Sequence, residues 1–214
     1  MADPVVPVSF TSLIETANRH LRRVPAWPAY PLAFGYVGWL VWLGATGGLG
    51  VEPVVALQRA LGEAALYLLI AGLAVTPLRR HAGLNLLKFR RALGLSCFIF
   101  VVAHFLAWAV LDLQSLGRVW ADIVKRPYIT VGMAGLALLI PLALTSNNWS
   151  IRRLGARWRQ LHRLTYAAAL LGAVHYIMLV KGFQIRPLIF LAVILILLLL
   201  RLRPGRLAMR FQRG

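Results

Sequence analysis

Cysteine and acidic residues are scarce in this 214-residue chain. The single cysteine, Cys97, can form no internal disulfide, and one thiolate cannot hold an iron–sulfur cluster or a structural zinc ion. A covalently attached c-type haem is excluded because no Cys-x-x-Cys-His motif is present. Only six acidic residues occur, and only Glu63 enters a long apolar run, near its end. Proton pumps and ion-coupled transporters usually carry carboxylates near mid-membrane, so these classes are disfavoured.

The first 30 residues lack a basic start followed by an apolar stretch and a small-residue cleavage site, so no cleavable secretory signal is expected. Their stretch "SFTSLIETANRHLRR" fits either a short helix at the cytoplasmic membrane surface or a disordered segment. The chain shows no serine–histidine–acid set, and Cys97 has no base beside it, so hydrolytic catalysis is not indicated.

Apolar residues, in contrast, are abundant. Hydrophobic residues make up 60% of the chain and charged residues 14%, whereas about 45 to 50% of a soluble domain is apolar. Six apolar runs approach the length of about 20 residues that a membrane-spanning helix needs. They cover residues 32–46, 61–78, 92–111, 128–145, 164–180 and 188–200. We therefore predict an all-α integral membrane protein: a cytoplasmic segment (1–30), a bundle of six transmembrane helices (31–200) and a basic cytoplasmic tail (201–214).

Positive charge is distributed unevenly across these runs. Of the 24 lysines and arginines, 18 fall in segments that the spans place on one side: Arg19, Arg22, Arg23, Arg79, Arg80, Lys88, Arg90, Arg91, Arg152, Arg153, Arg157, Arg159, Arg163, Arg201, Arg203, Arg206, Arg210 and Arg213. The other side carries Arg59, Arg118, Lys125, Arg126, Lys181 and Arg186. By the positive-inside rule both termini are cytoplasmic. Topology thus accounts for the net charge, and no nucleic-acid binding is expected because no polar domain offers a recognition surface.

Two histidines lie inside predicted spans at matching depth. His104 and His175 each lie about 20 Å of helix beyond the last arginine of the preceding basic segment, and both helices run outward from the cytoplasm. Two neutral imidazoles that face each other in an apolar slot are what axial ligation of a b-type haem requires. Small residues nearby leave room for it: Ala103, Ala107, Gly172 and Ala173. Alternatively, each histidine satisfies itself within the bundle; the matched depth favours His104 and His175 as haem iron ligands.

His162, at the cytoplasmic edge of the fifth run, does not pair as simply. On a straight helix it projects about 140° away from His175, so both turn inward only if the helix bends or begins after His162. At its depth the third run has Arg91, with Arg90 beside it, and arginine is not an ordinary haem ligand. A second haem with a weaker ligand, a quinone or flavin site, and a simple interfacial histidine all stay open. Arg90 and Arg91 suit propionates or a flavin phosphate, or act as topology anchors.

Several motifs occur in order along the chain: "GGLG" from Gly47, "TPLRR" from Thr76, "RRALGLSCFIFVVAHFLAW" from Arg90, "KRPYITVG" from Lys125, "LTS" at 144–146 and "RWRQLHRLTYAAALLGAVHY" from Arg157. Together they resemble the MsrQ family, also called YedZ, from about residue 35 to residue 200. The resemblance implies a ferric-reductase-like transmembrane domain in a bacterial inner membrane. It also implies electron flow from the respiratory quinone pool through haem b to MsrP, a periplasmic molybdenum-cofactor subunit that reduces methionine sulfoxide in oxidised proteins. The family is associated with FMN as well.

The resemblance carries over to single residues. It implies that His104 and His175 form the outer haem pair of the wider superfamily and that His162 is its inner histidine on the fifth helix. Arginine stands where that superfamily has an inner histidine on the third helix, which puts a full second bis-histidine haem in doubt. The chain ends too soon for the FAD and NADPH domains of the large ferric reductases, so we expect electrons to enter from another molecule.

We therefore expect a membrane electron-transfer subunit that forms a heterodimer with an MsrP-like partner. The outer segments "GGLGVEPVVALQRALGE" and "DLQSLGRVWADIVKRPY" are expected to dock that partner. Two alternatives are a ferric reductase-type cytochrome b and, from a different class, a haem-free membrane anchor or transporter whose histidines only pack.

Overall fold

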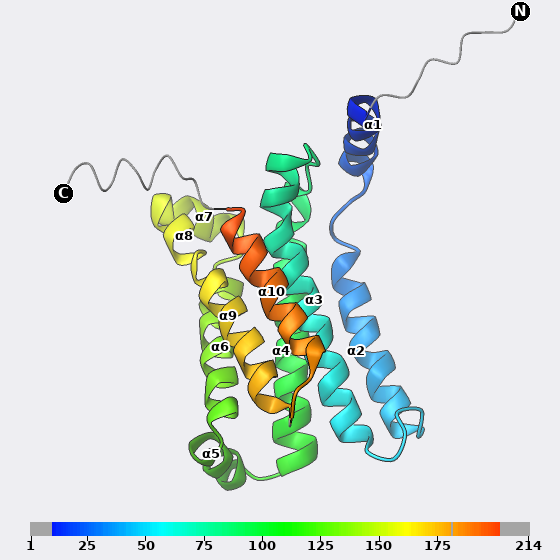
Figure 1. The fold of residues 1–214 in the computed structure, drawn as a ribbon, viewed down its shortest axis with the longest axis vertical. Helices are drawn as coiled ribbons and strands as arrows, with labels where there is room; N and C mark the ends of the chain where they lie inside the picture. Colours follow the sequence, from blue (N-terminus) through cyan, green and yellow to red (C-terminus); the bar gives the residue numbers. More distant parts are fainter. Residues whose placement is uncertain (1–9, 181, 202–214) are drawn as a thin grey trace, which may run out of the picture.

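The computed structural model describes residues 10–180 and 182–201, and this part of the chain is all-helical (Figure 1). The long helices of the bundle are α2 (Ala29–Ala45), α3 (Pro53–His81), α4 (Arg90–Leu106), α6 (Pro127–Leu144), α9 (Leu164–Leu179) and α10 (Ile185–Leu199). The shorter elements are α1 (Phe10–Arg23), η1 (Leu87–Phe89), η2 (Ala107–Leu113), α5 (Leu116–Lys125), α7 (Asn148–Leu154) and α8 (Ala156–Leu161). Lys181 and most of the predicted basic tail, residues 202–214, lie outside the described residues.

Each predicted apolar run overlaps one long helix, and the all-α prediction is confirmed. Three described segments are long and apolar enough to cross a membrane, namely Pro53–His81, Leu87–Leu113 and Pro127–Leu144, while α2 and α10 are shorter apolar helices. α3 begins well before the predicted residue 61, because Pro53 occupies the first turn, where its missing N–H costs no hydrogen bond. α1 forms within the N-terminal stretch for which a short helix was one of two expectations.

The third predicted run is not one continuous α-helix. α-Helical geometry ends at Leu106, and η2 continues as a π-helix that closes with a 3.1 Å hydrogen bond from the Gln114 N–H to the Ala109 carbonyl. α5, α7 and α8 were also not predicted. Each is too short to carry a long apolar run, and α7 begins at a local cap in which the Asn147 side chain accepts the Ser150 N–H at 2.8 Å.

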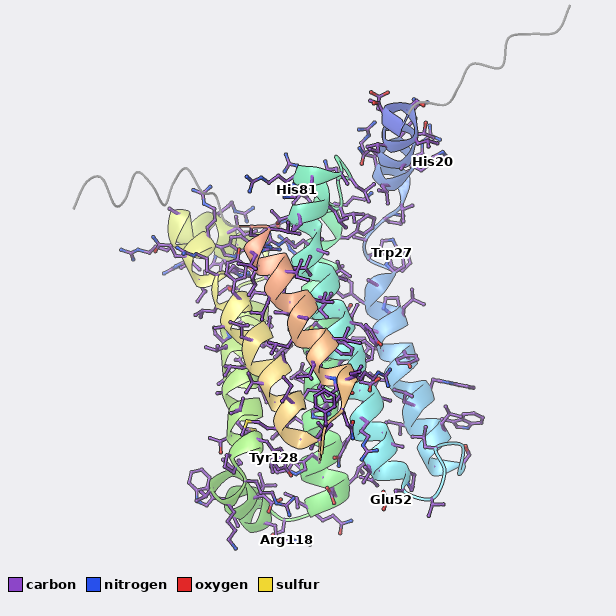
Figure 2. The ribbon with its side chains drawn as sticks, viewed as in Figure 1. His20, Trp27, Glu52, His81, Arg118 and Tyr128 are labelled. Carbon is purple, nitrogen blue, oxygen red and sulfur yellow. The ribbon has the colours of Figure 1, made fainter. Side chains whose placement is uncertain are left out.

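The bundle has two chemically distinct ends. His20, Trp27 and His81 lie towards one end, which also holds α7 and α8 and is called the α8 end (Figures 1 and 2). Glu52 and Arg118 lie at the other, called the α5 end (Figure 2). Within the described part of the chain, the basic segments that the sequence assigned to one side, 19–23, 79–91 and 152–163, gather at the α8 end (Figure 1).

Packing divides the bundle into two main helix pairs. α3 packs most extensively on α4, and α6 packs most extensively on α9, while α10 contacts both α9 and α3. Ala169 and Ala173 on α9 are completely buried, as is Ile194 on α10, so small side chains let these helices approach closely. The two pairs leave space between them that holds the polar side chains described below.

Arg201 stabilises the end of α3. Pro77 has no N–H, so the Leu73 carbonyl four residues earlier lacks its helical donor. The Arg201 guanidinium donates to this carbonyl and also, at 3.0 Å, to the Tyr166 hydroxyl. A proline inside α3 is therefore tolerated because a side chain from beyond α10 replaces the missing donor.

Candidate functional site

His104 on α4 and His175 on α9 face each other at the α5 end of the bundle. Their ring centres are 6.2 Å apart and the rings are nearly perpendicular, at 83°. Both line a cavity of about 660 Å³, which we call the histidine-pair cavity. The prediction that these two histidines lie at matching depth and face one another is confirmed by this geometry.

Each imidazole is oriented by a main-chain carbonyl from the neighbouring helix of its pair. His104 Nδ1 lies 2.8 Å from the Gln58 carbonyl on α3, and His175 Nδ1 lies 2.7 Å from the Tyr128 carbonyl on α6. A carbonyl only accepts hydrogen bonds, so both Nδ1 atoms carry the proton and both Nε2 atoms keep a free lone pair. Histidines that bind metals are commonly held in this way, with the second nitrogen donating to a carbonyl.

The two helices that supply these carbonyls, α3 and α6, also carry a glycine beside each histidine ring, which leaves room for it. A Cβ atom at Gly62 would lie 3.3 Å from His104 Nδ1, and one at Gly132 would lie 2.8 Å from His175 Nδ1. Each glycine follows by four residues the residue whose carbonyl binds the histidine, and within a helix that carbonyl points towards this position. An imidazole that reaches the carbonyl therefore passes over the glycine, where a larger residue blocks it. Sequence reasoning assigned neither glycine a role: Gly62 is a glycine inside an apolar run, and Gly132 is the last residue of the quoted motif "KRPYITVG".

The geometry fits one metal ion between the two rings. An imidazole nitrogen binds a metal at about 2.0 Å, so two imidazoles on opposite sides of one ion have ring centres about 6 Å apart. The observed 6.2 Å agrees with this arrangement. Among residues 10–180 and 182–201, no group of three or more His, Cys, Asp or Glu side chains is placed to hold a metal ion. Two histidines across a large cavity suit an ion whose remaining ligands come from a cofactor.

Charged side chains line the histidine-pair cavity around the ring pair. Glu63 accepts a hydrogen bond from the Tyr176 hydroxyl at 3.0 Å and forms an ion pair with Arg186 at 3.0 Å. Glu63 is thus neutralised locally. The expectation that it lies near the end of its helix is wrong, because α3 begins at Pro53 and Glu63 lies about 15 Å of helix further on. Arg126 lies on the same cavity, and its hydrogen bond to the Tyr128 hydroxyl raises the pKa of its guanidinium above the usual value.

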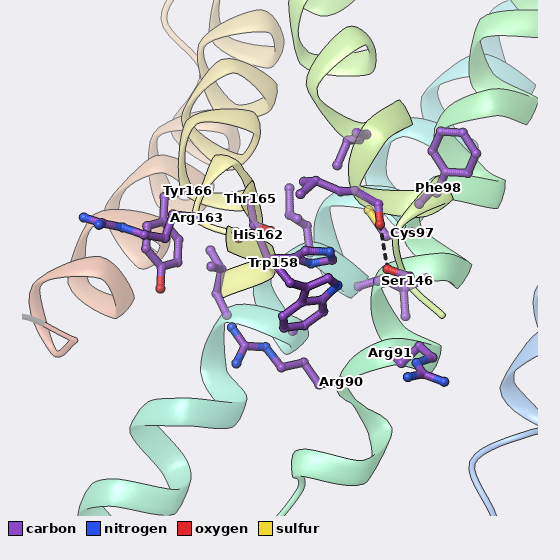
Figure 3. A pocket seen from close by; sticks show the side chains of 18 of the residues that line it. Arg90, Arg91, Cys97, Phe98, Ser146, Trp158, His162, Arg163, Thr165 and Tyr166 are labelled. Atoms are coloured by element: carbon purple, nitrogen blue, oxygen red, sulfur yellow. Dashed lines mark hydrogen bonds between the residues drawn. The ribbon is translucent and has the colours of Figure 1, made fainter. Parts of the chain in front are cut away.

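A second cavity of about 580 Å³ lies at the α8 end and is called the Trp158 cavity (Figure 3). His162 lies between α8 and α9, in a turn that interrupts helical geometry, so the expectation of a bend or a later helix start is confirmed. Trp158 stacks on His162 with ring centres 3.9 Å apart, and the Trp158 Nε1–H donates to the Thr145 carbonyl at 2.9 Å.

The protonated nitrogen of His162 follows from its neighbours. The Thr145 hydroxyl lies 2.6 Å from the Pro141 carbonyl and must donate its proton to it. His162 Nε2, 3.0 Å from the Thr145 oxygen, is then the donor to that oxygen, and Nδ1 keeps the lone pair. Burial, and after it the positive charge of Arg90, hold the pKa of His162 below its usual value. The Nε2 of His162 is therefore already occupied.

Arg90 and Arg91 both line the Trp158 cavity but differ in their contacts. Figure 3 shows Arg90 next to Trp158, whereas Arg91 points to another side, where its guanidinium donates to the Asn148 side chain at 2.7 Å. The equal-depth prediction that His162 faces Arg91 is wrong: the arginine whose charge acts on His162 is Arg90. Equal depth does not say which way a side chain points, because two consecutive residues on a helix point about 100° apart.

Sequence reasoning also missed three contributors to the Trp158 cavity. Trp158, Thr145 and Tyr166 lie in the quoted motifs but were given no role of their own; Trp158 and Tyr166 line the cavity with His162, and Thr145 bonds to His162 at its edge. They come from the C-terminal cap of α6, from α8 and from α9, so only the tertiary structure brings them together.

Comparisons with known proteins agree with this geometry. Residues 61–173 match the family described as ferric reductase like transmembrane component. Proteins named "Protein-methionine-sulfoxide reductase heme-binding subunit MsrQ" from Brucella ovis, Brucella canis and Brucella suis are each 50% identical to the chain over 180 residues, which cover 83% of this chain and 82% of each relative. No solved structure matches the chain. The chain therefore belongs to the MsrQ family of ferric reductase-like transmembrane proteins.

Proposed function

We propose that this protein is the membrane electron-transfer subunit of a protein-methionine-sulfoxide reductase system. In this proposal His104 and His175 hold haem b, electrons enter from the quinone pool, and they leave to a periplasmic MsrP-like subunit with a molybdenum cofactor. Haem binding and the reductase partnership are supported by the names of the relatives. The quinone donor, FMN and the partner's cofactor rest on the family resemblance.

One observation carries the haem assignment. The two Nε2 lone pairs belong to rings 6.2 Å apart, and both rings are fixed by main-chain carbonyls before any ligand binds. Such fixing matters because a free imidazole loses rotamer freedom on binding, whereas these two have already lost it. Haem b, when bound, supplies a one-electron carrier. The chain's contribution is to hold it and to set its depth in the cavity between the helix pairs α3–α4 and α6–α9.

The Trp158 cavity is proposed as the site where the electron donor, a quinol or a reduced flavin such as FMN, approaches. Trp158 and His162 present a stacked pair of flat rings, which suits a planar ring system. Arg90 lies beside them, and the charges of Arg90 and Arg201 lie close to Tyr166, so a phosphate or another anionic group finds cationic partners. A second haem is less well supported, because the Nε2 of His162 is bonded to Thr145.

The topology is proposed as six spans formed by α2, α3, α4 with η2, α6, α9 and α10, over residues 31–200 and with both termini cytoplasmic. The concentration of basic residues at the α8 end supports it through the positive-inside rule. The α8 end then faces the cytoplasm and the α5 end faces the periplasm. This orientation puts the Trp158 cavity on the donor side and the histidine-pair cavity on the acceptor side.

Haem stoichiometry in three variants tests the proposal. His104→Ala and His175→Ala are expected to lose haem, seen as loss of the Soret and α bands of the dithionite-reduced protein, whereas His162→Ala is expected to keep it. Full haem retention in both of the first two variants refutes the ligand pair. A purified protein without any b-type spectrum supports the haem-free anchor. Efficient reduction of ferric chelates by quinol, with no reduction of an MsrP-like partner, supports the ferric reductase.

Binding of FMN or a quinone analogue tests the Trp158 cavity. Arg90→Ala is expected to weaken binding, because Arg90 lies beside the stacked rings. Arg91→Ala is the matched control, since its guanidinium is engaged by Asn148. Equal weakening by the two substitutions contradicts the placement of the ligand beside Trp158 and points to a general electrostatic effect.

A further inference from the structure

α5 carries an exposed apolar stripe. Leu116, Trp120 and Val124 are 88%, 70% and 68% exposed, and their spacing of four residues places them along one side of the helix. Three large apolar side chains in a row are rarely left in water without a partner, and such a stripe marks an interaction surface.

The other sides of α5 are chemically different. At about 100° per residue, Arg118 and Lys125 lie roughly 150° from the centre of the stripe. Figure 2 shows Arg118 at the extreme of the α5 end, away from the bundle. Val119 and Ile123, which are half-buried, lie between these two sides, towards the bundle. The apolar stripe therefore faces back towards the level of the spanning helices, and the basic side faces away from it.

The position of α5 is fixed by its connections. It lies at the end of the bundle next to α6 (Figure 1) and packs on α6 and η2. The Thr130 hydroxyl on α6 donates to the Ile123 carbonyl at 2.6 Å, and Asp122 pairs with Arg126 at 3.5 Å. α5 is thus held beside the points where one apolar segment ends and the next begins, which is where a membrane surface lies.

We propose that α5 lies in the membrane–water interface, with Leu116, Trp120 and Val124 inserted among the lipids. An apolar side, a basic side and a tryptophan at the boundary are the features of a helix that lies in the plane of a membrane. Lipid is the favoured occupant because the stripe faces the level of the membrane that the spanning helices cross. Arg118 and Lys125 lie on the opposite side of α5, towards water. The sequence led us to expect that this segment docks the partner protein, and that role is the alternative outcome of the experiment below.

Nitroxide accessibility in lipid nanodiscs tests the proposal on the full, haem-loaded chain. Leu116→Cys, Trp120→Cys and Val124→Cys carry the label, with Arg118→Cys and Lys125→Cys as matched controls on the basic side. Native Cys97 is buried and stays in place. Labels on the stripe are expected to be more accessible to oxygen than to a water-soluble nickel chelate, and labels at the controls are expected to show the reverse.

Two results overturn the proposal. If the labels on the stripe are as accessible to the nickel chelate as the control labels are, the face is exposed to water and free for a protein partner. If neither oxygen nor the nickel chelate reaches the labels on the stripe, the face is covered by protein, such as a second copy of the chain. A second measurement leaves the cysteines unchanged: brominated lipids are expected to quench less of the fluorescence of Trp120→Phe than of the wild-type protein, and equal quenching contradicts lipid contact.

Discussion

The closest contact that a single methyl group creates in the histidine-pair cavity is at Gly132. Alanine at this position places Cβ 2.8 Å from His175 Nδ1 and 3.0 Å from Cε1. The first distance is about 0.7 Å short of the roughly 3.5 Å at which such atoms pack well. The imidazole must move away from α6, and the 2.7 Å hydrogen bond to the Tyr128 carbonyl is lost or lengthened.

The expected magnitude follows from the role of that hydrogen bond. Removing a partner that orients a ligating histidine typically lowers metal affinity about 10- to 100-fold, which corresponds to about 1.4 to 2.7 kcal/mol of binding free energy. The helix itself does not suffer, because alanine has a higher helix propensity than glycine by about 1 kcal/mol. Gly132→Ala is therefore expected to weaken haem binding while the protein stays folded.

Haem titration of the apoprotein in nanodiscs, followed by the Soret band, measures this effect. Gly135→Ala is the control: it lies one turn further along α6, and its Cβ would meet only the Leu171 Cβ at 3.7 Å, an ordinary contact. Gly62→Ala on α3 is expected to show a smaller loss, because its contact with His104 is 3.3 Å. The reasoning is refuted if Gly132→Ala binds haem as tightly as Gly135→Ala and with the wild-type spectrum.

Two further predictions concern the α8 end. Arg201→Met leaves the Leu73 carbonyl without the donor that Pro77 cannot supply. The free energy of unfolding is therefore expected to fall by about 1 to 3 kcal/mol. Thermal unfolding measures this loss, with Arg79→Met at an exposed position as the control, and equal melting temperatures of the two variants contradict it. His162 has a pKa below its usual value in the folded protein, so the unfolded chain takes up more protons as the pH falls through about 6.5 and stability decreases. His162→Gln is expected to flatten this decrease between pH 7.5 and 5.5, and an unchanged slope excludes His162 as its source.

Apolar run length was enough to predict the long helices, because a membrane-spanning helix must satisfy its own backbone and therefore reveals itself as one continuous apolar segment. The same logic failed for α5, α7 and α8, whose short lengths fall below what such a run can reveal. It also missed the change from α- to π-geometry after Leu106, because both geometries carry the same side chains.

Depth along the helices was enough to pair His104 with His175, since rise per residue is nearly constant and errors in it are small. Residue counting was not enough to predict the direction in which a side chain points around its helix, because each residue turns that direction by about 100° and small errors accumulate. This is why Arg91 was chosen as the neighbour of His162 and the structure shows Arg90 instead.

By itself, then, the sequence determined an all-helical membrane protein, the concentration of basic residues between alternate spans, and two histidines at one depth. Only the tertiary structure decided which groups hold those histidines: the carbonyls of Gln58 and Tyr128 and the space left by Gly62 and Gly132. Carbonyls are present at every residue and leave no mark in a sequence, so their role appears only when α3 packs on α4 and α6 packs on α9.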